Sequence, residues 1–309
     1  MAKKVFVVAG PTASGKTKLA IELAKKYNGE IVSADSMQVY RRMDIGTAKA
    51  DAWERAQAVH HMLDVAEPWE EYSVSRYVQE ATACCEDILS RGKLPIICGG
   101  TGQYIDALVA GLDFADRQED MSLRQSLYDD YERLGGGEML RILAEFDPER
   151  AQKLHPSDMR RIVRAIEIYR LTGVTMTEHD RLTRERPKRY EPFTVVLSYK
   201  DRARLYEMID RRVDLMVERG LYEEVQTLLN SGLSDENTAM QAIGYKEAVM
   251  ALRDEISREE AAELIKQNSR RYAKRQLTWF RRNKDAQWIE WEELPDNERA
   301  LRLIEENFG

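Results

Sequence analysis

Residues 10–17 read Gly-Pro-Thr-Ala-Ser-Gly-Lys-Thr, which is the phosphate-binding pattern G-x-x-x-x-G-K-[ST]. An apolar run at 5–9 precedes this loop and a helical pattern at 18–27 follows it, so the loop joins a strand to a helix. Its glycines permit a tight bend with inward N–H groups, and the helix start adds a positive dipole. Lys16 adds a point charge and the Thr17 hydroxyl can hold Mg²⁺. The sequence therefore predicts a binding site for a phosphate chain.

The composition is typical of a soluble globular protein large enough for two domains: 309 residues, 43% hydrophobic and 33% charged. No apolar run is long enough for a membrane span. Cys84, Cys85 and Cys98 make no disulfide framework and no signal peptide precedes the first strand, so we expect a cytoplasmic protein. A net charge of −7 argues against indiscriminate coating of nucleic acid but permits local basic patches. We expect a monomer.

The first hundred residues alternate strand and helix. Strands are expected at 4–9, 30–34 and 95–98, with helices at 18–27 and 75–91 between them. This alternation predicts an α/β fold, a P-loop NTPase-like parallel sheet flanked by crossover helices. Ligands on such sheets bind beyond the carboxyl ends of the strands. Three loops end there, and we expect them to share one pocket: 10–17, 35–38 and 99–102.

The pattern divides the chain into three parts. Residues 1–113 form the first part of the P-loop α/β core. Residues 114–192 form an all-helical insertion domain, and residues 193–309 return to the core with basic C-terminal helices. Within the last two parts we expect helices at 123–134, 138–146 and 159–172, a strand at 193–198, helices at 202–219, 221–230, 245–252 and 258–280, and a last strand at 287–291.

Asp35 closes the second strand, and three roles are open to it. The carboxylate can be a Mg²⁺ ligand through water, a general base in the pocket, or a helix cap without a catalytic role. The third strand ends in Gly99-Gly100 and lacks the acid with which a hydrolytic NTPase holds its metal. The Gly-Gly-Thr-Gly loop instead offers backbone donors and the Thr101 hydroxyl. This favours binding of a diphosphate over hydrolysis of a triphosphate.

A second signal is basic and aromatic. Residues 266–284 contain eight lysines and arginines and no acidic residue, with Tyr272 and Trp279 among them. Such a helix suits contact with a phosphate backbone and stacking on bases, whereas the ordinary alternative is a solvated helix face. In a chain of negative net charge we favour an anionic polymer as the partner. A second basic cluster lies in the insertion: Arg160, Arg161 and Arg164.

His60 and His61 are the first candidates for a metal pair. Adjacent side chains on a strand or helix point apart, so the two rings do not easily share one ion. No cysteine or third histidine lies near them in the sequence. We therefore expect no zinc site there.

Several blocks together resemble the bacterial tRNA dimethylallyltransferases, also called tRNA isopentenyltransferases. The most specific are Ser-Ala-Asp-Ser-Met-Gln-Val-Tyr-Arg at 33–41 and Lys-Arg-Gln-Leu-Thr-Trp-Phe-Arg at 274–281. The resemblance extends from residue 4 to about residue 291 and also includes the P-loop, 44–49, 60–61, 99–102, 155–156 and 241–247. It implies that a dimethylallyl group passes from dimethylallyl diphosphate to N6 of adenosine 37, beside the tRNA anticodon. It also implies that diphosphate leaves and that Mg²⁺ assists.

The resemblance assigns roles residue by residue. Asp35 matches the base that takes a proton from N6, and Thr101, Lys16 and Arg212 complete the catalytic set. The diphosphate-binding residues are Gly10, Thr12, Ala13, Ser14, Gly15, Lys16 and Thr17, with Thr17 next to Mg²⁺. The insertion is expected to clamp the anticodon stem. The implied tRNA contacts are Asp35, Ser36, Met37, Gln38, Thr101, Arg124, Arg160, Arg161, Arg164, Gln241, Gly244, Tyr245, Lys246, Lys274, Arg275, Gln276, Thr278, Trp279 and Arg281.

Three other functions fit parts of the sequence. A nucleotide or small-molecule kinase would use the P-loop for ATP. A non-catalytic RNA-binding protein would keep the basic helices beside an unused P-loop. A cytokinin-type enzyme would prenylate free AMP or ADP, but a free nucleotide needs no extended cationic surface such as residues 266–284.

Overall fold

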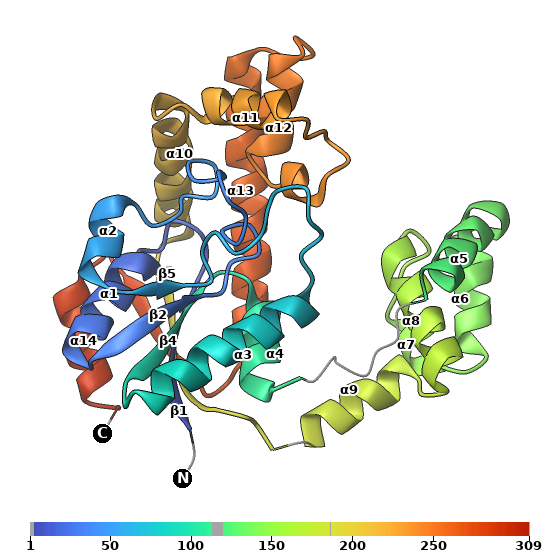
Figure 1. The fold of residues 1–309 in the computed structure, drawn as a ribbon, viewed down its shortest axis with the longest axis horizontal. Coiled ribbons are helices and arrows are strands. Elements are labelled where there is room, and N and C mark those ends of the chain that lie inside the picture. The colour runs from blue at the N-terminus through green and yellow to red at the C-terminus, as the bar shows by residue number, and fades with distance from the viewer. Residues whose placement is uncertain (1–2, 113–119, 186, 309) are drawn as a thin grey trace. The chain divides into compact units, whose positions relative to one another are not determined.

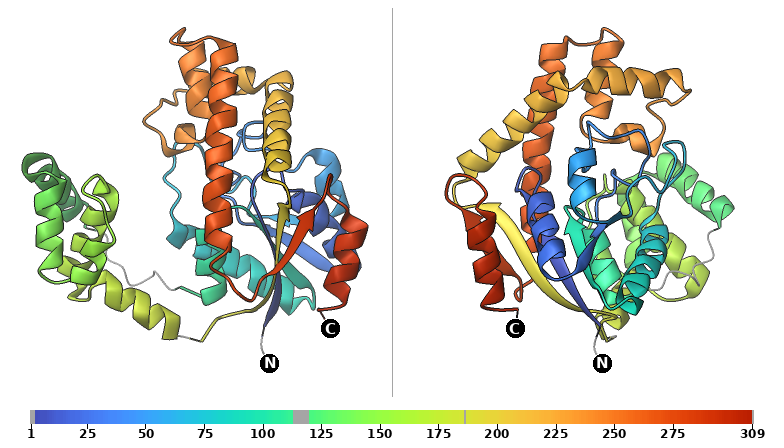
Figure 2. Two further views of the ribbon diagram at one scale, coloured as in Figure 1. Left: turned by 180° about the vertical axis from the view of Figure 1, so that it is seen from behind. Right: turned by 60° about the vertical axis from the view of Figure 1, so that its left-hand side comes forward.

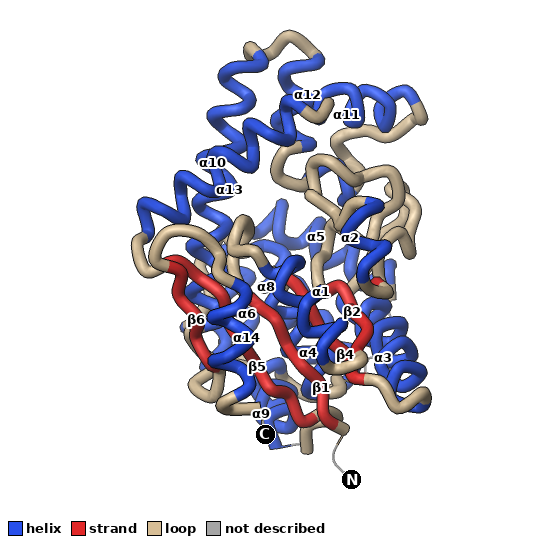
Figure 3. Tube along the Cα trace, turned by 90° about the vertical axis from the view of Figure 1, so that its left-hand side faces the viewer, coloured by secondary structure: helices blue, strands red, loops and turns tan. Residues whose placement is uncertain are grey.

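The computed structural model describes residues 3–112, 120–185 and 187–308. Its sheet has six strands, all paired in parallel, in the order β3-β2-β4-β1-β5-β6 (Figures 1 and 3). The predicted α/β fold with a parallel sheet is therefore confirmed. The strands are β1 (Lys4–Ala9), β2 (Gly29–Ser33), β3 (His60–His61), β4 (Leu94–Gly99), β5 (Glu191–Tyr199) and β6 (Gln287–Trp291).

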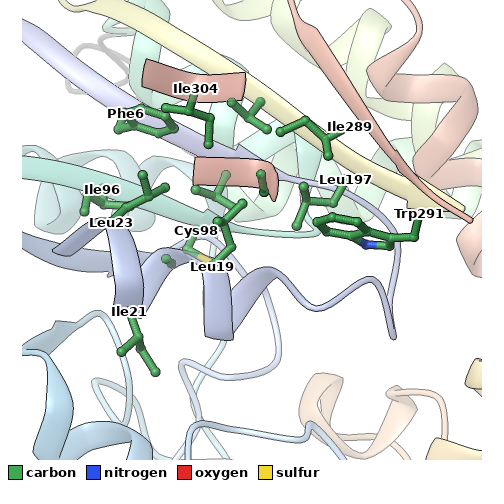
Figure 4. Packing of buried hydrophobic residues seen from close by; sticks show 14 of the residues in the cluster. Phe6, Leu19, Ile21, Leu23, Ile96, Cys98, Leu197, Ile289, Trp291 and Ile304 are labelled. Carbon is green, nitrogen blue, oxygen red and sulfur yellow. The ribbon is translucent and has the colours of Figure 1, made fainter. Parts of the chain in front are cut away.

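Helices cover both faces of this sheet, and apolar side chains fill the space between. Phe6 of β1 and Leu197 of β5 pack in one buried cluster with Leu19 of α1 (Lys16–Lys26) and Ile304 of α14 (Asn297–Glu305), as Figure 4 shows in part. α3 (Val74–Ser90) contacts β2 and β4, and α4 (Gly102–Ala110) contacts β4 and packs on α3. The sheet is therefore buried on both sides, as the long apolar strands require.

A helical arm extends beyond the carboxyl edge of the sheet (Figure 1). Its longest helix, α13, contacts α10 and α12 along the arm and reaches α4 beside the sheet. Because parallel strands all point their carboxyl ends toward this edge, the arm stands next to the predicted ligand pocket. The arm consists of α10 (Arg202–Glu218), α11 (Leu221–Asn230), the 3₁₀ helix η1 (Thr238–Gln241), α12 (Tyr245–Leu252) and α13 (Arg258–Phe280).

The chain divides into two compact units, Met1–Gly111 with Arg189–Gly309, and Leu112–Lys188. The second unit corresponds to the predicted insertion, and its described part is helical around a core of Leu127, Leu143 and Ile166. The boundary predicted after residue 192 lies too late, because Glu191 and Pro192 already pair with Lys4 and Val5 in the sheet. The helices are α5 (Met121–Leu134), α6 (Gly136–Ala144), α7 (Pro148–Gln152), α8 (Met159–Thr172) and α9 (Met176–Glu185).

Most predicted elements are present, and several have the predicted bounds. β1, β6, α8, α11, α12 and α13 begin and end at the predicted residues. The pattern analysis missed β3, α2 (Ala52–Gln57), α4, α7, α9 and α14. α2 carried an unused signal, because Asp51 and Glu54 form a capping box at its start. Within the described residues no helix is long and apolar enough to cross a membrane.

The ion pairs of Glu30 in β2, next to the edge strand β3, allow a test of how much a buried carboxylate stabilises the sheet. Its buried carboxylate accepts hydrogen bonds from Arg91 at 2.5 and 2.7 Å and from Lys93 at 2.7 Å, and it contacts His61 at 2.7 Å. These partners hold the pKa of Glu30 far below its usual value, the Arg91 bond above all. We expect Glu30→Gln to lower the free energy of unfolding by about 1–3 kcal/mol near neutral pH.

The sign of the pH dependence follows from the lowered pKa. The carboxylate stabilises the fold fully above its unfolded pKa, and the contribution is lost as the pH falls below about 4. Urea unfolding at several pH values should therefore show the two proteins converging in acid. Glu290→Gln, at an exposed position in β6, is the matched control. A Glu30→Gln deficit that stays constant down to acid pH would contradict this account.

Candidate active site

The P-loop turns between β1 and α1 with a backbone that favours glycine. Gly10 and Gly15 have φ values of 150° and 83°, and Ala13 adopts φ 62°. A side chain at Gly10 would meet the backbone oxygen of Leu197 in β5, since an ideal Cβ lies 2.5 Å from it. The helix starts at Lys16, two residues before the predicted start, so Lys16 and Thr17 stand in its first turn. This is the concave geometry that binds anions at a helix start.

Two cations of this pocket have no carboxylate hydrogen-bond partner among the residues that the structure describes. Burial, together with the nearby Arg212, lowers the pKa of Lys16 to about 8, and its Nζ donates to the Pro11 carbonyl at 2.6 Å. Arg212 comes from α10; burial lowers its pKa as well, and its buried Nε has no hydrogen-bond partner in the described part of the chain. Because buried charge is costly without a partner, the pair favours an anion at the P-loop.

Asp35 belongs to the same electrostatic neighbourhood, because its charge raises the pKa of both Lys16 and Arg212. Its Oδ1 accepts hydrogen bonds from the backbone N–H groups of Met37 at 2.9 Å and Gln38 at 3.4 Å. The carboxylate is therefore anchored through one oxygen in a tight turn directly after β2. In the described residues no hydrogen bond engages Oδ2.

Thr101 ties the end of β4 to the turn that carries Asp35. Its Oγ1 accepts from the Ser36 backbone N–H at 3.0 Å and donates to Ser36 Oγ at 3.4 Å, and its own N–H donates to Ala34 O at 3.1 Å. β2 and β4 are neighbours in the sheet, and Gly99 is needed where they meet, since an ideal Cβ would lie 2.1 Å from Ala34 O. The structure thus brings together the three predicted loops.

Gln276 of α13 joins two of these loops. It is buried, its Oε1 accepts from the Thr12 N–H at 3.0 Å and its Nε2 donates to the Gly100 carbonyl at 2.9 Å. Both ends of the amide are therefore used inside the protein, although the resemblance assigned Gln276 to tRNA. Tyr272, one turn earlier, interacts with Thr101 and Gln276, and burial raises its pKa to about 12.

Trp279, about one turn after Gln276 in α13, packs beside the same Gly-Gly-Thr-Gly loop. Its ring lies against Gly102, where an ideal Cβ would be 2.2 Å from Trp279 Cδ1. Its Nε1 donates to Asp106 at 2.9 Å, and the Arg282 guanidinium stacks 4.0 Å from the ring centroid. The five-membered part of the ring packs on Gly102 and Arg282 lies over the ring, so both contacts are made within the protein.

The basic segment 266–284 divides into two parts. Lys266 pairs with Asp214 at 2.8 Å and Arg270 pairs with Asp210 at 2.5 Å, both on α10, so these two cations hold the arm together. The later cations are exposed. A shallow hollow on this end of α13 is lined by Arg271, Lys274, Arg275, Thr278, Trp279 and Arg282. Arg281 is also exposed, so the predicted cationic face is present in this half of the segment.

The arginines of the insertion fall into two groups. Arg124 of α5 and Arg164 of α8 donate to the fully buried carboxylate of Glu167, at 3.0 and 2.7 Å. Arg160 and Arg161 are exposed at the start of α8. The first pair therefore stabilises the helical unit, while the second pair is directly available to an anionic ligand.

The remaining predicted tRNA contacts are mostly engaged within the protein. Gln38 accepts from Ser33 Oγ at 3.1 Å and donates to the carbonyls of Thr47 and Ala48 at 3.2 and 3.3 Å. Tyr245 is fully buried. Gly244, at φ 100°, starts α12; Gln241 and Lys246 are exposed beside it, and the Gln241 side chain bonds to the Asp235 carbonyl.

Sequence reasoning missed three residues that support the P-loop from outside. Trp291 of β6 donates from Nε1 to the Ser14 carbonyl at 2.9 Å, and the Tyr199 hydroxyl of β5 donates to the Ala13 carbonyl at 3.4 Å. Pro295 packs on Gly15. Trp291 ends the predicted strand 287–291 and Tyr199 directly follows the predicted strand 193–198, but neither position says which loop the side chain meets.

Thr17 is the residue best placed for a metal ion. Its hydroxyl stands in the first turn of α1 and makes no hydrogen bond within the described residues. The described residues contain no group of three or more His, Cys, Asp or Glu that could hold a metal alone. The donor set therefore fits a Mg²⁺ that takes its other ligands from substrate oxygens and water, as this ion commonly does.

Two family models match the chain: IPP transferase over residues 38–283 and Isopentenyl transferase over residues 3–62. A tRNA dimethylallyltransferase from Caldanaerobacter subterraneus subsp. tengcongensis is 47% identical over 305 residues, with 96% of each chain covered. One from Acetivibrio thermocellus is 45% identical over 300 residues, with 97% of this chain and 96% of the relative covered.

Solved structures agree with these matches. A tRNA isopentenylpyrophosphate transferase from Bacillus halodurans is 39% identical with a TM-score of 0.73, covering 98% of this chain and 94% of that chain. A eukaryotic dimethylallyltransferase, solved acting on tRNA, is 32% identical with a TM-score of 0.81, covering 99% of this chain and 79% of that chain. Together with the P-loop and the Asp35 turn, these similarities show that the chain belongs to the IPP transferase family, in which its relatives are tRNA dimethylallyltransferases.

Proposed function

We propose that this chain transfers a dimethylallyl group from dimethylallyl diphosphate to N6 of adenosine 37 in tRNA and releases diphosphate. One observation carries the proposal: Lys16 and Arg212, which form no hydrogen bond with a carboxylate of the described residues, lie at a P-loop within the electrostatic reach of Asp35. The cations suit a diphosphate, and the carboxylate suits the proton of an amine. The relatives named above act on tRNA by name.

The reaction needs stabilisation of negative charge on the leaving diphosphate and an acceptor for the proton of the attacking amine. The bond from the allylic carbon to the diphosphate oxygen breaks, and a bond from the same carbon to N6 forms. Negative charge grows on the leaving oxygens, so Lys16 and Arg212 stabilise the transition state more than the bound substrate. Asp35 accepts the proton that N6 loses, and its anchored turn holds the carboxylate still for this step.

Mg²⁺ would bind at Thr17 together with substrate oxygens and would neutralise charge on the diphosphate. The P-loop amides and Lys16 orient the same group from the protein side. The Ser14 hydroxyl is committed to the Pro11 carbonyl at 2.8 Å, so its part in this site is to shape the loop.

The tRNA is expected to bind through exposed cations. The C-terminal half of α13 supplies Lys274 and Arg275, Arg281 follows directly after the helix, and the insertion supplies Arg160 and Arg161. Contacts of this kind bind phosphates and fix the register of the RNA. The target adenine lies in a single-stranded loop, so turning it toward Asp35 costs a few kcal/mol at most, on the order given for flipped bases.

Asp35→Asn tests the base directly. The amide keeps an oxygen for the Met37 and Gln38 N–H groups but cannot take a proton. With labelled dimethylallyl diphosphate and unmodified tRNA, we expect turnover to fall by roughly 10²–10⁴-fold while tRNA affinity is retained. The label should appear on tRNA and not on free AMP. Label on AMP would contradict the proposed acceptor, and equal turnover in the two proteins would remove Asp35 from the mechanism.

Lys16 predicts a pH effect on donor binding. Its pKa of about 8 means that the ammonium is charged below this value and neutral above it. The dissociation constant of dimethylallyl diphosphate should therefore rise as the pH increases from about 7 to 9, by up to about tenfold for each pH unit above the pKa. Lys16→Met should bind weakly and without this slope. A slope that survives in Lys16→Met would assign the titration to another group.

Arg275→Ala tests the cationic face of α13. Losing one phosphate contact should weaken tRNA binding and reduce the slope of log affinity against log salt concentration by about 0.7–0.9. Arg302→Ala is the matched control, because Arg302 is an exposed arginine on α14, which packs on α1. If both substitutions leave the same slope as the unmodified chain, Arg275 makes no phosphate contact.

A further inference from the structure

Glu224 of α11 receives hydrogen bonds from three successive backbone N–H groups in the loop that follows the Asp35 turn. Its Oε2 accepts from Asp44 and Ile45, both at 2.8 Å, and its Oε1 accepts from Gly46 at 3.1 Å. The Tyr245 hydroxyl, at the start of α12, donates to Oε1 at 2.6 Å. Four donors on one carboxylate form a charge-assisted contact of the strong kind.

The surroundings of this contact are built to fit it. Three consecutive inward N–H groups make the kind of concave nest that binds anions, and here a side chain of the protein fills it. Gly46 leaves the space, because an ideal Cβ there would lie 2.5 Å from Tyr245 Cε2 and 2.9 Å from Leu221 Cδ1. We call Glu224, Tyr245 and the N–H groups of residues 44–46 the arm latch.

On one side of the latch, residues 40–49 are held together by hydrogen bonds, and this loop adjoins the Asp35 turn. Lys49 is buried and donates to the Tyr40 carbonyl at 2.7 Å, and to Asp44 and Asp64 at 2.6 and 2.7 Å. Two residues before Lys49, Thr47 donates to Met43. Residues 40–49 therefore behave as one cross-braced unit.

Gln38 connects this unit to the Asp35 turn. Its side-chain amide donates to the carbonyls of Thr47 and Ala48, and its backbone N–H donates to Asp35 Oδ1. A continuous set of hydrogen bonds thus runs from Glu224 to Asp35. Movement of the braced unit would be transmitted to the orientation of the carboxylate.

On the other side of the latch is the start of α12. Tyr245 follows Gly244, and Glu247 caps the helix by accepting from the Gly244 N–H at 2.8 Å and from Asn268 of α13 at 2.7 Å. Gln241 and Lys246, which the resemblance assigned to tRNA, are exposed on this segment. The latch therefore joins a segment expected to meet the RNA with the loop that holds the base.

We propose that Glu224 and Tyr245 are positioning residues that lock the Asp35 turn to the helical arm, so that the carboxylate stays aligned with the amine during transfer. The proposal rests on the proposed function for its kinetic part. It gives Tyr245 a role in alignment in place of the direct tRNA contact that the resemblance implied.

Glu224→Gln and Tyr245→Phe test the latch. A carboxamide presents one NH₂ where the carboxylate presented an acceptor, so it opposes at least one of the loop N–H groups, whereas Tyr245→Phe removes a single donor and keeps the ring on Gly46. With both substrates saturating, we expect the single-turnover rate to fall by about tenfold in Glu224→Gln, the order of a small misplacement of a catalytic group. Tyr245→Phe should give a smaller fall, and the double variant should be no slower than Glu224→Gln alone, because the two residues act through one contact.

Amide hydrogen exchange, measured on the chain without substrates, tests the hydrogen bonds of the latch independently of the transfer rate. The N–H groups of residues 44–46 should exchange faster in both variants, while the strands of the sheet keep their protection. Glu223→Gln is the matched control, since Glu223 is an exposed neighbour on the same helix. It should change neither exchange nor rate.

Unchanged exchange at 44–46, or faster exchange with a wild-type transfer rate, would overturn the proposal. Independent, multiplying effects of Glu224→Gln and Tyr245→Phe would do the same. If Glu224→Gln does not fold, Tyr245→Phe decides on both measurements. A wild-type chain that transfers no label would reject the proposed function and with it the kinetic role of the latch, while the exchange measurement would still decide whether the contact exists.

Discussion

Two cations at the P-loop, Lys16 and Arg212, organise the site, because no carboxylate of the described residues forms a hydrogen bond with either of them. Lys16 has its pKa lowered by burial and by Arg212, and the Arg212 Nε is buried without a hydrogen-bond partner in the described chain. Keeping these two cations charged costs stability, because burial disfavours the charged form of both and Arg212 also disfavours that of Lys16. In the proposed reaction an arriving diphosphate would offset that cost and gain the P-loop amides, which would concentrate binding energy on the leaving group.

The two faces of α13 have different surroundings: one packs on the P-loop and the Gly-Gly-Thr-Gly loop, and the other is exposed and cationic. Its buried face inserts Gln276 between the P-loop and the Gly-Gly-Thr-Gly loop and packs Trp279 on Gly102. Its exposed face carries the cations of the last three turns. The same helix therefore contacts the P-loop and the Gly-Gly-Thr-Gly loop and also presents the exposed cations; it runs the length of the helical arm (Figure 2).

Local patterns predicted the P-loop, the main strands, the helices of the arm and the cationic half of α13. They could not predict contacts between segments far apart in the chain. Gln276 and Thr12 are 264 residues apart, Trp291 and Ser14 are 277 residues apart, and no spacing rule links them. The resemblance placed motifs in the right region, but a motif mixes residues that face the ligand with residues that hold them. Gln276 is of the second kind, because its amide is fully used inside the protein.

The two carboxylate oxygens of Asp35 differ in their hydrogen bonds. Oδ1 is held by the N–H groups of Met37 and Gln38, so it fixes the rotation of the carboxylate. Thr101 holds the same turn from the sheet through the Ser36 N–H. The turn is braced on the sheet side and joined to the arm on the other, and in the proposed reaction Oδ2 is the oxygen that would take the proton. A general base is effective only when its acceptor atom is within hydrogen-bond reach of the proton, so the alignment of the turn matters as much as the presence of the carboxylate.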